Sequence, residues 1–362
     1  MNTATTTIPM IERVPDVPAG GALGLAERGL FPDALLRIGI RRLCARRLHE
    51  ESEGGPDMQG ERFQQRLAML RESPLAIHTD AANRQHYELP AAFFQRCLGP
   101  RLKYSACYYP SGTETLAQAE DAMLALYGER AELADGQDIL ELGCGWGSLT
   151  LWMAERYPQA RITAVSNSLS QRQFIEARCQ ERQLGNVRVL TCDVNRLEFA
   201  DAQFDRCVSI EMFEHVRNYD VLLSRIGRWL RIHGKLFVHI FCHRTLMYPF
   251  EVEGEDDWMG RHFFTGGLMP SADTLLWFQD DMRLERRWLL DGHHYQRTAN
   301  HWLQAQDRHR DELLPVLNQA YGDAANLWLQ RWRMFWMACA ELFGYADRTE
   351  WMLAHYRFCR GS

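Results

Sequence analysis

The sequence predicts an α/β protein in which a parallel β-sheet is covered by helices on both faces. Short apolar runs typical of buried strands recur through the middle of the chain, at 138–143, 161–166, 187–193, 204–210 and 235–240. Segments with helical spacing lie between these runs, at 147–157, 169–182 and 220–231. Strands that alternate with helices in this way form parallel sheets, and ligands bind beyond the carboxyl ends of such strands. We therefore expect the functional site at that edge of the sheet.

Helices are expected before the sheet. Residues 23–50 carry leucines and isoleucines near helical spacing, with arginines between them. The segment "HEESEGGPDMQGE" (49–61) is typical of an exposed loop, and further helices are expected at 61–72 and 114–133. The first residues lack the charged start and apolar core of a signal peptide, so 1–22 is expected to be a disordered lead.

After residue 243 the alternation of strands and helices fades. Residues 250–267 are typical of a long insertion, and tryptophan-rich helices are expected at 298–307, 311–321 and 323–343. We expect 243–300 to form a mobile cover, since such loops commonly exclude water and gate release. The expected parts of the chain are thus a lead (1–22), an N-terminal helical extension (23–133), a sheet-bearing core (134–243) and a C-terminal part with the cover insertion, the remaining strands and the last helices (244–362).

Composition narrows the class of partner. The chain has 362 residues, of which 46% are hydrophobic and 24% charged, as in an ordinary globular protein. Its net charge of −6 does not favour binding to nucleic acid or to an anionic membrane, although "RIGIRRLCARR" (37–47) is a local basic patch. No apolar stretch approaches the roughly 18–20 residues of a membrane span. The ten cysteines include no C-x-x-C pair, so neither a zinc site nor a disulfide framework is indicated, and a cytoplasmic location is expected.

A glycine-rich turn follows the first strand-like run. The stretch "ILELGCGWG" places Gly143, Gly145 and Gly147 between a strand and a helix, where glycines allow a tight turn and close approach of a ligand. A plain strand-to-helix turn would also fit this spacing. An acid before the turn, Glu141, and another at the end of the third strand, Asp193, favour a binding site. No G-K-[ST] follows, which excludes a triphosphate-binding loop.

The second strand ends differently from that of a dinucleotide site. An acid often stands there to hold ribose hydroxyls, but "AVSNSLSQRQ" offers Asn167 and Gln171, which bond a hydroxyl without charge. Ser148 also stands where the last glycine of G-x-G-x-x-G would fall. The glycine spacing is therefore wrong for G-x-G-x-x-G, whereas the end of the second strand is irregular for dinucleotide and methyl-donor sites alike.

The fourth strand ends in a cluster of titratable groups. The segment "SIEMFEHVRNYD" (209–220) holds Glu211, Glu214 and His215, which would share one face if a helix began there. Two carboxylates beside an imidazole are costly unless a cationic or protic group lies among them. The cluster therefore predicts a cation site, while helix capping or pairing with Arg217 is the structural alternative. A metal site is not indicated, because H-E-x-x-H is absent.

Several separated motifs resemble one known family. The segments "LELGCGWGSLTLWMAERYP", "SNSLSQ", "EMFEH", "HYELP" and "HHYQRT" together resemble the cyclopropane-fatty-acid synthase family of S-adenosylmethionine-dependent enzymes, from about residue 25 to the end. Within it, "KYSACYY", "FVHIFCH", "WFQDD", "AELFGY" and "EWMLAH" are most similar to the coclaurine N-methyltransferase branch. The resemblance implies a Rossmann-like class I methyltransferase sheet with a helical N-terminal extension and a helical and irregular C-terminal cover. It also implies an enzyme that uses S-adenosyl-L-methionine and a small, aromatic or benzylic, amine substrate.

The same resemblance implies roles for individual residues. The implied catalytic residues are Glu211, Glu214 and His215, with the glutamates neutralising the ammonium and the histidine as base. The implied cofactor-binding residues are Tyr104, Ser105, Gly143, Gly145, Asn167, Gln171, Asp193, Val194 and Ile210. The implied substrate-binding residues are Tyr87, Glu88, His239, Tyr295 and Trp332. For Glu88 a surface loop acid, and for Trp332 a core tryptophan, are the alternatives.

The choice of branch depends on a bicarbonate site. Cyclopropane synthases resemble one another in a site that includes a Tyr-Ser-Cys segment and a His-x-Ile segment. Here Ala106 stands in place of the cysteine and Phe241 in place of the isoleucine, so the implied site is incomplete. The sequence therefore favours an amine N-methyltransferase over a lipid-modifying methyltransferase and over a non-catalytic S-adenosylmethionine-binding protein. The oligomeric state is left open, with a homodimer as one option.

The glutamates also lead to an expectation about pH. Negative charges on Glu211 and Glu214 would raise the pKa of His215 by favouring imidazolium. A bound ammonium would push that pKa back down, and activity would rise with pH through a value near the imidazole pKa in the bound complex.

Overall fold

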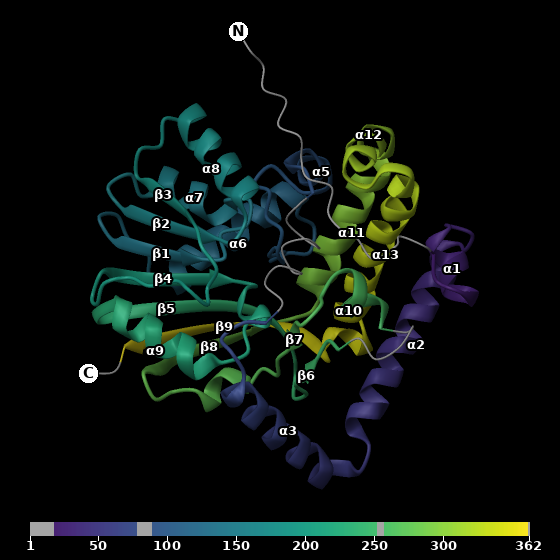
Figure 1. Cartoon of the computed structure of the whole chain (residues 1–362), viewed down its shortest axis with the longest axis horizontal. Coiled ribbons are helices and arrows are strands. Elements are labelled where there is room, and N and C mark those ends of the chain that lie inside the picture. The colour runs from purple at the N-terminus through teal and green to yellow at the C-terminus, as the bar shows by residue number, and fades with distance from the viewer. Residues whose placement is uncertain (1–17, 78–88, 252–256, 361–362) are drawn as a thin grey trace.

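One mixed sheet organises the chain. The computed structural model describes residues 18–77, 89–251 and 257–360, and within them seven strands form a sheet in the order β3-β2-β1-β4-β5-β9-β8 (Figure 1). The strands are β1 (Asp138–Leu142), β2 (Arg161–Ser166), β3 (Val187–Thr191), β4 (Phe204–Ile210), β5 (Leu230–His243), β8 (Met282–Leu290) and β9 (Trp351–Arg360). A two-stranded sheet joins β6 (Tyr248–Pro249) to β7 (Leu268–Met269). The predicted α/β class is confirmed.

The parallel arrangement holds for β1 to β5, and β9 is the exception. Strand β9 pairs antiparallel with both β5 and β8, so that the start of β9, Trp351, faces the end of β5, His243. The helices between β8 and β9 therefore leave and re-enter the sheet at the same, carboxyl-terminal edge. The chain must then run back through the sheet, which reverses the direction of β9.

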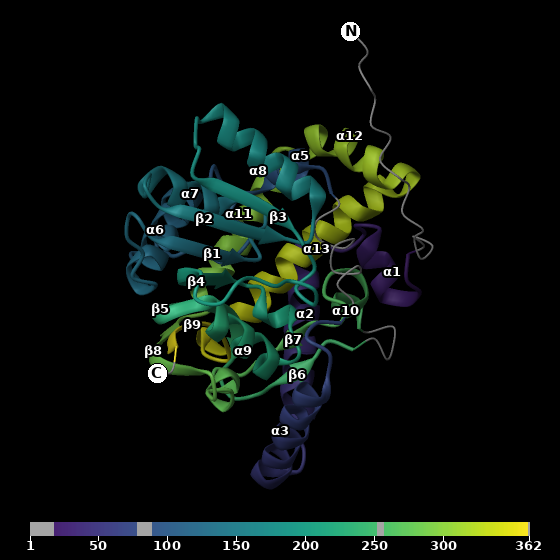
Figure 2. The ribbon, with the colours of Figure 1, turned by 60° about the vertical axis from the view of Figure 1, so that its left-hand side comes forward.

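Helices cover both faces of the sheet, and further helices lie beside the sheet on one side (Figure 2). The α-helices are α1 (Gly21–Glu27), α2 (Asp33–Ser52), α3 (Gly55–Glu72), α5 (Ala91–Cys97), α6 (Leu116–Arg130), α7 (Ser148–Arg156), α8 (Leu169–Glu181), α9 (Tyr219–Trp229), α10 (Trp258–His262), α11 (His293–Arg308), α12 (Arg310–Tyr321) and α13 (Ala325–Phe343). The 3₁₀ turns are η1 (Phe213–His215), η2 (Thr274–Trp277), η3 (Gly322–Ala324) and η4 (Ala346–Arg348). The predicted helices at 147–157, 169–182 and 311–321 correspond closely to α7, α8 and α12.

The two faces of the sheet belong to different hydrophobic cores. Ile139 and Val208 point into a core shared with α6, α7 and the C-terminal helices. Their sequence neighbours point to the other face of the sheet, where a second core lies. Leu140 and Cys207 point into that opposite core, which includes Leu222 and the rest of the buried face of α9. Side chains alternate between the faces of a strand, so a strand buried on both faces is apolar throughout. This is why the predicted strands are continuous apolar runs.

The N-terminal helices differ from the prediction. The expected helix at 23–50 is two helices, α1 and α2, because Gly29 takes a positive φ of 71° and Pro32 has no amide hydrogen to continue α1. The expected loop at 49–61 is wrong, since α3 already begins at Gly55, with Gly54 in the left-handed turn and a proline in its first turn. Of the expected lead, 1–17 lies outside the described residues, and α1 begins at Gly21.

The expected cover at 243–300 is only partly a separate segment. Strand β8 lies within that range and pairs with β9, so 282–290 belongs to the main sheet. The short helix α10 is attached to the N-terminal region, since Trp258 Nε1 donates to Glu27 Oε1 at 2.8 Å. Arg331 of α13 donates to the same carboxylate at 2.9 Å. These contacts join α1, α10 and α13; mobility of the segment stays a prediction.

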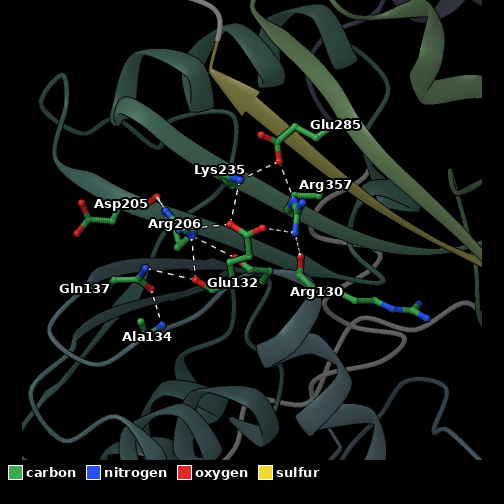
Figure 3. A network of polar contacts seen from close by, with 10 residues as sticks. Arg130, Glu132, Ala134, Gln137, Asp205, Arg206, Lys235, Glu285 and Arg357 are labelled. Atoms are coloured by element: carbon green, nitrogen blue, oxygen red, sulfur yellow. Dashed lines mark hydrogen bonds and ion pairs between the residues drawn. The ribbon is translucent and has the colours of Figure 1, made fainter.

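Ion pairs fasten the amino-terminal edge of the sheet, opposite the carboxyl ends of β1 to β5 (Figure 3). Glu132, just after α6, lies 2.9 Å from Lys235 Nζ and 2.6 Å from Arg357 Nη1. Glu285 pairs with the same two cations, at 3.0 and 2.7 Å. The network therefore joins α6 to β5, β8 and β9, and leaves the carboxyl-terminal edge to the site.

Candidate active site

One cavity opens at the carboxyl ends of the parallel strands, and all of the predicted cofactor-binding residues line it. These residues are Tyr104, Ser105, Gly143, Gly145, Asn167, Gln171, Asp193, Val194 and Ile210. They come from the segment before α6 and from the turns after β1, β2, β3 and β4. The cavity wall also includes Glu211 and His215 of the predicted catalytic cluster, but among the described residues it does not include Glu214.

The glycine turn after β1 keeps part of this cavity open. Gly143 and Gly145 have positive φ angles of 81° and 51°, which favour glycine. A Cβ added at Gly145 would meet no atom within 4 Å, so this position borders open space. A Cβ at Gly143 would lie 2.8 Å from the Cβ of Met212, so the turn also needs glycine to approach the end of β4.

The polar groups of the cavity fit a ligand with hydroxyl groups. Gln171 is 1% exposed; its Oε1 accepts a hydrogen bond from Ser166 Oγ at 2.6 Å, and its Nε2 has no partner among the described residues. A buried amide without a partner is uncommon, so this donor is available to a ligand. Asp193 Oδ1 accepts the backbone N–H of Asn195 at 2.8 Å, which fixes that carboxylate after β3. These groups fit the ribose and adenine of S-adenosylmethionine.

The acid before the glycine turn is not a free charge. Glu141 is 3% exposed, and burial raises its pKa to about 8, although Thr150 donates a hydrogen bond to it at 2.5 Å. At neutral pH this carboxyl group is mostly protonated. It can donate a hydrogen bond into the cavity as well as accept one.

The catalytic cluster is held by a tight turn and not by the start of an α-helix. Glu211 has a positive φ of 48°, and Phe213–His215 forms a single 3₁₀ turn before α9 begins at Tyr219. Asn218 caps α9 by accepting the N–H of Val221. The expectation that the cluster shares one face of an α-helix is therefore wrong. The left-handed backbone conformation of Glu211 turns the chain away from the path that an α-helix would take.

Glu211 is bound by groups from three distant parts of the chain. Its Oε1 accepts the backbone N–H of Ala106 at 2.8 Å and lies 3.3 Å from His239 Nε2. Its Oε2 accepts the hydroxyl of Tyr295 at 2.9 Å. The amide of Phe241 instead donates to Glu214 Oε1 at 2.7 Å. The backbone amides of the two divergent positions, Ala106 and Phe241, therefore bind the protein's own carboxylates.

The two glutamates hold a single negative charge. Burial alone would raise the pKa of Glu211, but His239, Lys103 and the amide of Ala106 hold it below the ordinary value. Burial, with the nearby charge of Glu211, holds the pKa of Glu214 well above the ordinary value. Like charges this close do not both ionise readily. The directions of the two shifts place the negative charge on Glu211 first, and a role of Glu214 in neutralising an ammonium stays a prediction.

His215 is neutral at ordinary pH. Loss of solvent around the ring lowers its pKa to about 4, and this effect outweighs the nearby negative charge of Glu211. The ring centroid lies 4.7 Å from that of Phe264. The expectation of a raised pKa is wrong, because the sequence does not reveal how completely the ring loses water. A neutral imidazole has one nitrogen that can accept a proton.

Lys103 is a residue of the cavity wall that the sequence analysis did not select. It is 2% exposed, and its Nζ donates to Ser105 Oγ and to the carbonyl of Ala106, both at 2.6 Å. It therefore orients the segment that also binds Glu211. A lysine at the start of the aromatic run "KYSACYY" was the available signal, because a lone charge in an apolar segment is either exposed or paired.

Three of the five predicted substrate-binding residues lie in the described part of the chain, and their surroundings differ. Tyr87 and Glu88 lie outside the described residues. His239 and Tyr295 meet at Glu211, as described above. Trp332 is fully buried between Phe93 and Phe263, at centroid distances of 4.8 and 5.0 Å, which agrees with the core alternative; a wall of the amine pocket stays a prediction for it.

Comparison with a family model identifies the chain. The model described as "Mycolic acid cyclopropane synthetase" matches residues 76–350. The chain belongs to this family. It is also 38% identical to (S)-coclaurine N-methyltransferase of Thalictrum flavum subsp. glaucum, over 92% of this chain and 93% of that protein. It is 28% identical to the cyclopropane-fatty-acyl-phospholipid synthase of Escherichia coli K12, over 76% of this chain and 67% of that protein.

Solved structures agree with this membership. A crystal structure of coclaurine N-methyltransferase, bound to N-methylheliamine and SAH, superposes with a TM-score of 0.88 at 38% identity, over 92% of this chain and 97% of that chain. The mycolic acid cyclopropane synthase CmaA1 shares the fold at a TM-score of 0.67 and 22% identity, over 80% of this chain and all of that chain. The predictions of a Rossmann-like methyltransferase sheet, of S-adenosylmethionine as cofactor and of an N-methyltransferase are confirmed.

Proposed function

We propose that the chain methylates the nitrogen of a small aromatic or benzylic amine, with Glu211 binding the cationic amine and His215 accepting its proton. The observation that carries the proposal is the unequal pair at the cavity wall. One buried carboxylate is ionised there, and the imidazole four residues later is neutral.

The residues divide the work as follows. When bound, S-adenosylmethionine supplies an electrophilic methyl group. Glu211 attracts the ammonium form of the amine, and the attraction is strong because little water screens it. His215 takes one proton from the nitrogen, which exposes the lone pair that forms the new N–C bond. Glu214 stays protonated and holds the amide of Phe241, so it supports the turn.

An amine acceptor fits this site better than an alkene. An alkene offers no positive charge to Glu211 before transfer and leaves a carbocation whose proton must then be removed. The two positions that depart from the bicarbonate site, Ala106 and Phe241, donate their amides to Glu211 and Glu214. Two relatives are named for N-methylation of coclaurine and of pavine, and these names support an amine on an aromatic skeleton as the substrate.

A labelled-methyl assay tests the proposal. The protein is incubated with S-adenosylmethionine that carries a labelled methyl group and with phenethylamines, tetrahydroisoquinolines, tryptamines or acyl-phospholipid vesicles. Label in an amine product is the expected result. Label in the acyl chains would instead support the lipid alternative, and cofactor binding without turnover on any acceptor would support the non-catalytic one.

Three further expectations stay predictions. They are that the chain acts in the cytoplasm, that it binds no nucleic acid and that it can form a homodimer. A small-molecule substrate is consistent with the cavity at the carboxyl ends of the strands. Across 18–77, 89–251 and 257–360, no helix is both long and apolar enough to span a membrane.

A further inference from the structure

A row of buried side chains extends from Glu211 across the sheet. His239 of β5 and His355 of β9 are direct neighbours in the antiparallel register, and neither is exposed. His355 Nε2 lies 3.1 Å from His239 Nδ1, and His239 Nε2 lies 3.3 Å from Glu211 Oε1. The two rings therefore join β9 to the carboxylate at the cavity wall.

The residue at the far end of the row fixes the donor and the acceptor of each hydrogen bond along it. Arg130 Nη1 of α6 lies 2.8 Å from His355 Nδ1. A guanidinium only donates hydrogen bonds, so His355 must accept at Nδ1 and carry its proton on Nε2. That proton is donated to His239 Nδ1, which Tyr127 also reaches through its hydroxyl at 2.7 Å. His239 is left with its proton on Nε2, which lies 3.3 Å from Glu211 Oε1, within ion-pair distance.

The guanidinium of Arg130 is available for this contact. The carbonyl of Arg130 accepts a hydrogen bond from Arg357 at 3.2 Å, at the edge of the ion-pair network. Figure 3 shows the side chain of Arg130 pointing away from Glu132 and Glu285, the carboxylates of that network. Its charge lies over the ring of Trp288 instead, 4.9 Å from the centroid. Trp288 is the register neighbour of His355 on the other side of β9 from His239.

We propose that Arg130 and His355 are positioning residues which, through His239, hold Glu211 in place as the carboxylate that receives the amine. The proposal deepens the proposed function and rests on it for the identity of the cation. A path that carries the substrate's proton out is the alternative use of such a row. Arginine cannot accept a proton, so the row ends in a donor and orients Glu211 without draining protons from it.

The surrounding charges favour this arrangement. Burial, together with positive neighbours, holds the pKa of His239 and of His355 below the ordinary value, so both rings stay neutral. The titratable and charged groups that face the row come from every element packed against it. They are Lys103, Cys107 and Tyr108 before α6, Tyr127, Glu129 and Arg130 on α6, Glu214 on η1, Arg286 on β8, His294 and Tyr295 on α11, and Cys339 on α13.

The first test needs no turnover. The protein is labelled with ¹³C at the glutamate carboxyl carbon, its Glu211 signal is assigned with Glu211→Gln, and the signal is followed against pH without ligand. The midpoint of Glu211 should rise in Arg130→Gln and in His355→Leu. Arg286→Gln is the matched control, because Arg286 also lies over the ring of Trp288, at 5.1 Å, but has no hydrogen bond to His355. It should leave the midpoint unchanged.

The second test uses the reaction. Arg130→Gln and His355→Leu should raise the KM for the amine about 10-fold, as the loss of a hydrogen bond to a charged group typically does, with unchanged affinity for the cofactor. His355→Gln keeps an N–H donor and should recover most of the loss. If His355→Leu does not fold, Arg130→Gln decides the question, since Arg130 is only half-buried.

The outcomes separate the two proposals. If no amine is methylated by the wild-type protein but the Glu211 midpoint moves as expected, the proposed function fails and the positioning role stands. If amines are methylated while the Glu211 midpoint and the amine KM are the same in wild type, Arg130→Gln and His355→Leu, the positioning role is overturned.

Discussion

The two halves of the cavity are built from different kinds of group. The cofactor half is formed by backbone turns with positive φ at Gly143 and Gly145, and by a neutral amide at Gln171. The catalytic half is formed by two titratable groups, the buried side chain of Glu211 and the half-buried His215, whose charge states depend on the parts of the chain around them. The difference teaches that cofactor binding depends on shape, whereas amine binding and transfer depend on one charge. Substitutions in one half should therefore leave the other half largely unchanged.

Removal of the base should give the largest effect. His215→Ala is expected to lower kcat about 10²–10⁴-fold, the range typical of a general base. Cofactor affinity should change little, because the lost interaction belongs to the transfer step. Steady-state kinetics with a methylated amine, combined with calorimetry of S-adenosylmethionine, measures both quantities. Near wild-type turnover in this variant would assign the proton to water or to a carboxylate.

Removal of the charge should affect substrate binding next. Glu211→Gln keeps the shape of the side chain and is expected to raise the KM of the amine about 10–100-fold, since a hydrogen bond to a charged group contributes about 1.5–3 kcal/mol. The effects of Glu211→Gln and His215→Ala should not be additive, because both residues act on the same nitrogen. A double-mutant cycle on kcat/KM checks this; strict additivity would place the two residues on different parts of the substrate.

A change in shape should break the cofactor half alone. Gly145→Val would fill open space next to the turn and strain a φ of 51°, so the affinity for S-adenosylmethionine should fall about 10-fold or more. Gly136→Val is a matched control, because Gly136 has a similar positive φ of 81° and open space but lies before β1, away from the cavity. Calorimetry should find weak binding only in the first variant. Equal affinities in the two variants would mean that the cofactor lies elsewhere.

The pH profile sharpens the account of the catalytic half. The pKa of His215 is lowered to about 4, so the imidazole is neutral and active above that pH, and is lost as a base only as pH falls through about 4. After correction for ionisation of the amine, kcat/KM should be flat across the ordinary imidazole pKa of about 6.5. A fall in kcat/KM with a midpoint near that value, absent from His215→Ala, would show that the ring titrates as it does in water.

The smallest effect is expected at Glu214. Its pKa is held well above the ordinary value, so glutamine resembles the protonated side chain already present. Deprotonation favours the unfolded state of the wild type once the pH exceeds the ordinary carboxyl pKa, and Glu214→Gln removes that penalty. The variant should unfold at the same or a higher temperature at neutral pH and keep kcat/KM within about threefold. A marked fall in either quantity would indicate that Glu214 is ionised.

Local features of the sequence were sufficient to select residues that line one cavity, although their binding of the cofactor stays a prediction. Glycines at a strand-to-helix turn and amides after β2 take their positions from neighbouring residues, and the apolar runs determine where β1 to β4 lie. The residues of the catalytic half could be selected from the sequence, but their charge states could not be predicted from it. The pKa of His215 depends on lost solvent, and the state of Glu211 depends on Ala106, His239 and Tyr295, which are far away in the chain. Charge states of this kind arise only when the tertiary structure brings the groups together.

Breaks in the helices were also missed for a local reason. Leucine spacing at 23–50 continues across Gly29 and Pro32, but glycine and proline interrupt a helix more strongly than the apolar spacing favours it. The antiparallel direction of β9 depends instead on where α11 to α13 return the chain. That information is not present in the strand's own residues.

The central claim, one negative charge that receives a cationic amine, is tested most directly by comparing two substitutions three positions apart. Binding of a tetrahydroisoquinoline to the complex with S-adenosylhomocysteine would be measured by calorimetry in wild type, Glu211→Gln and Glu214→Gln. The account predicts affinity about 10–100-fold weaker in Glu211→Gln and near the wild-type value in Glu214→Gln. Equal losses in the two variants, or a larger loss in Glu214→Gln, would contradict it.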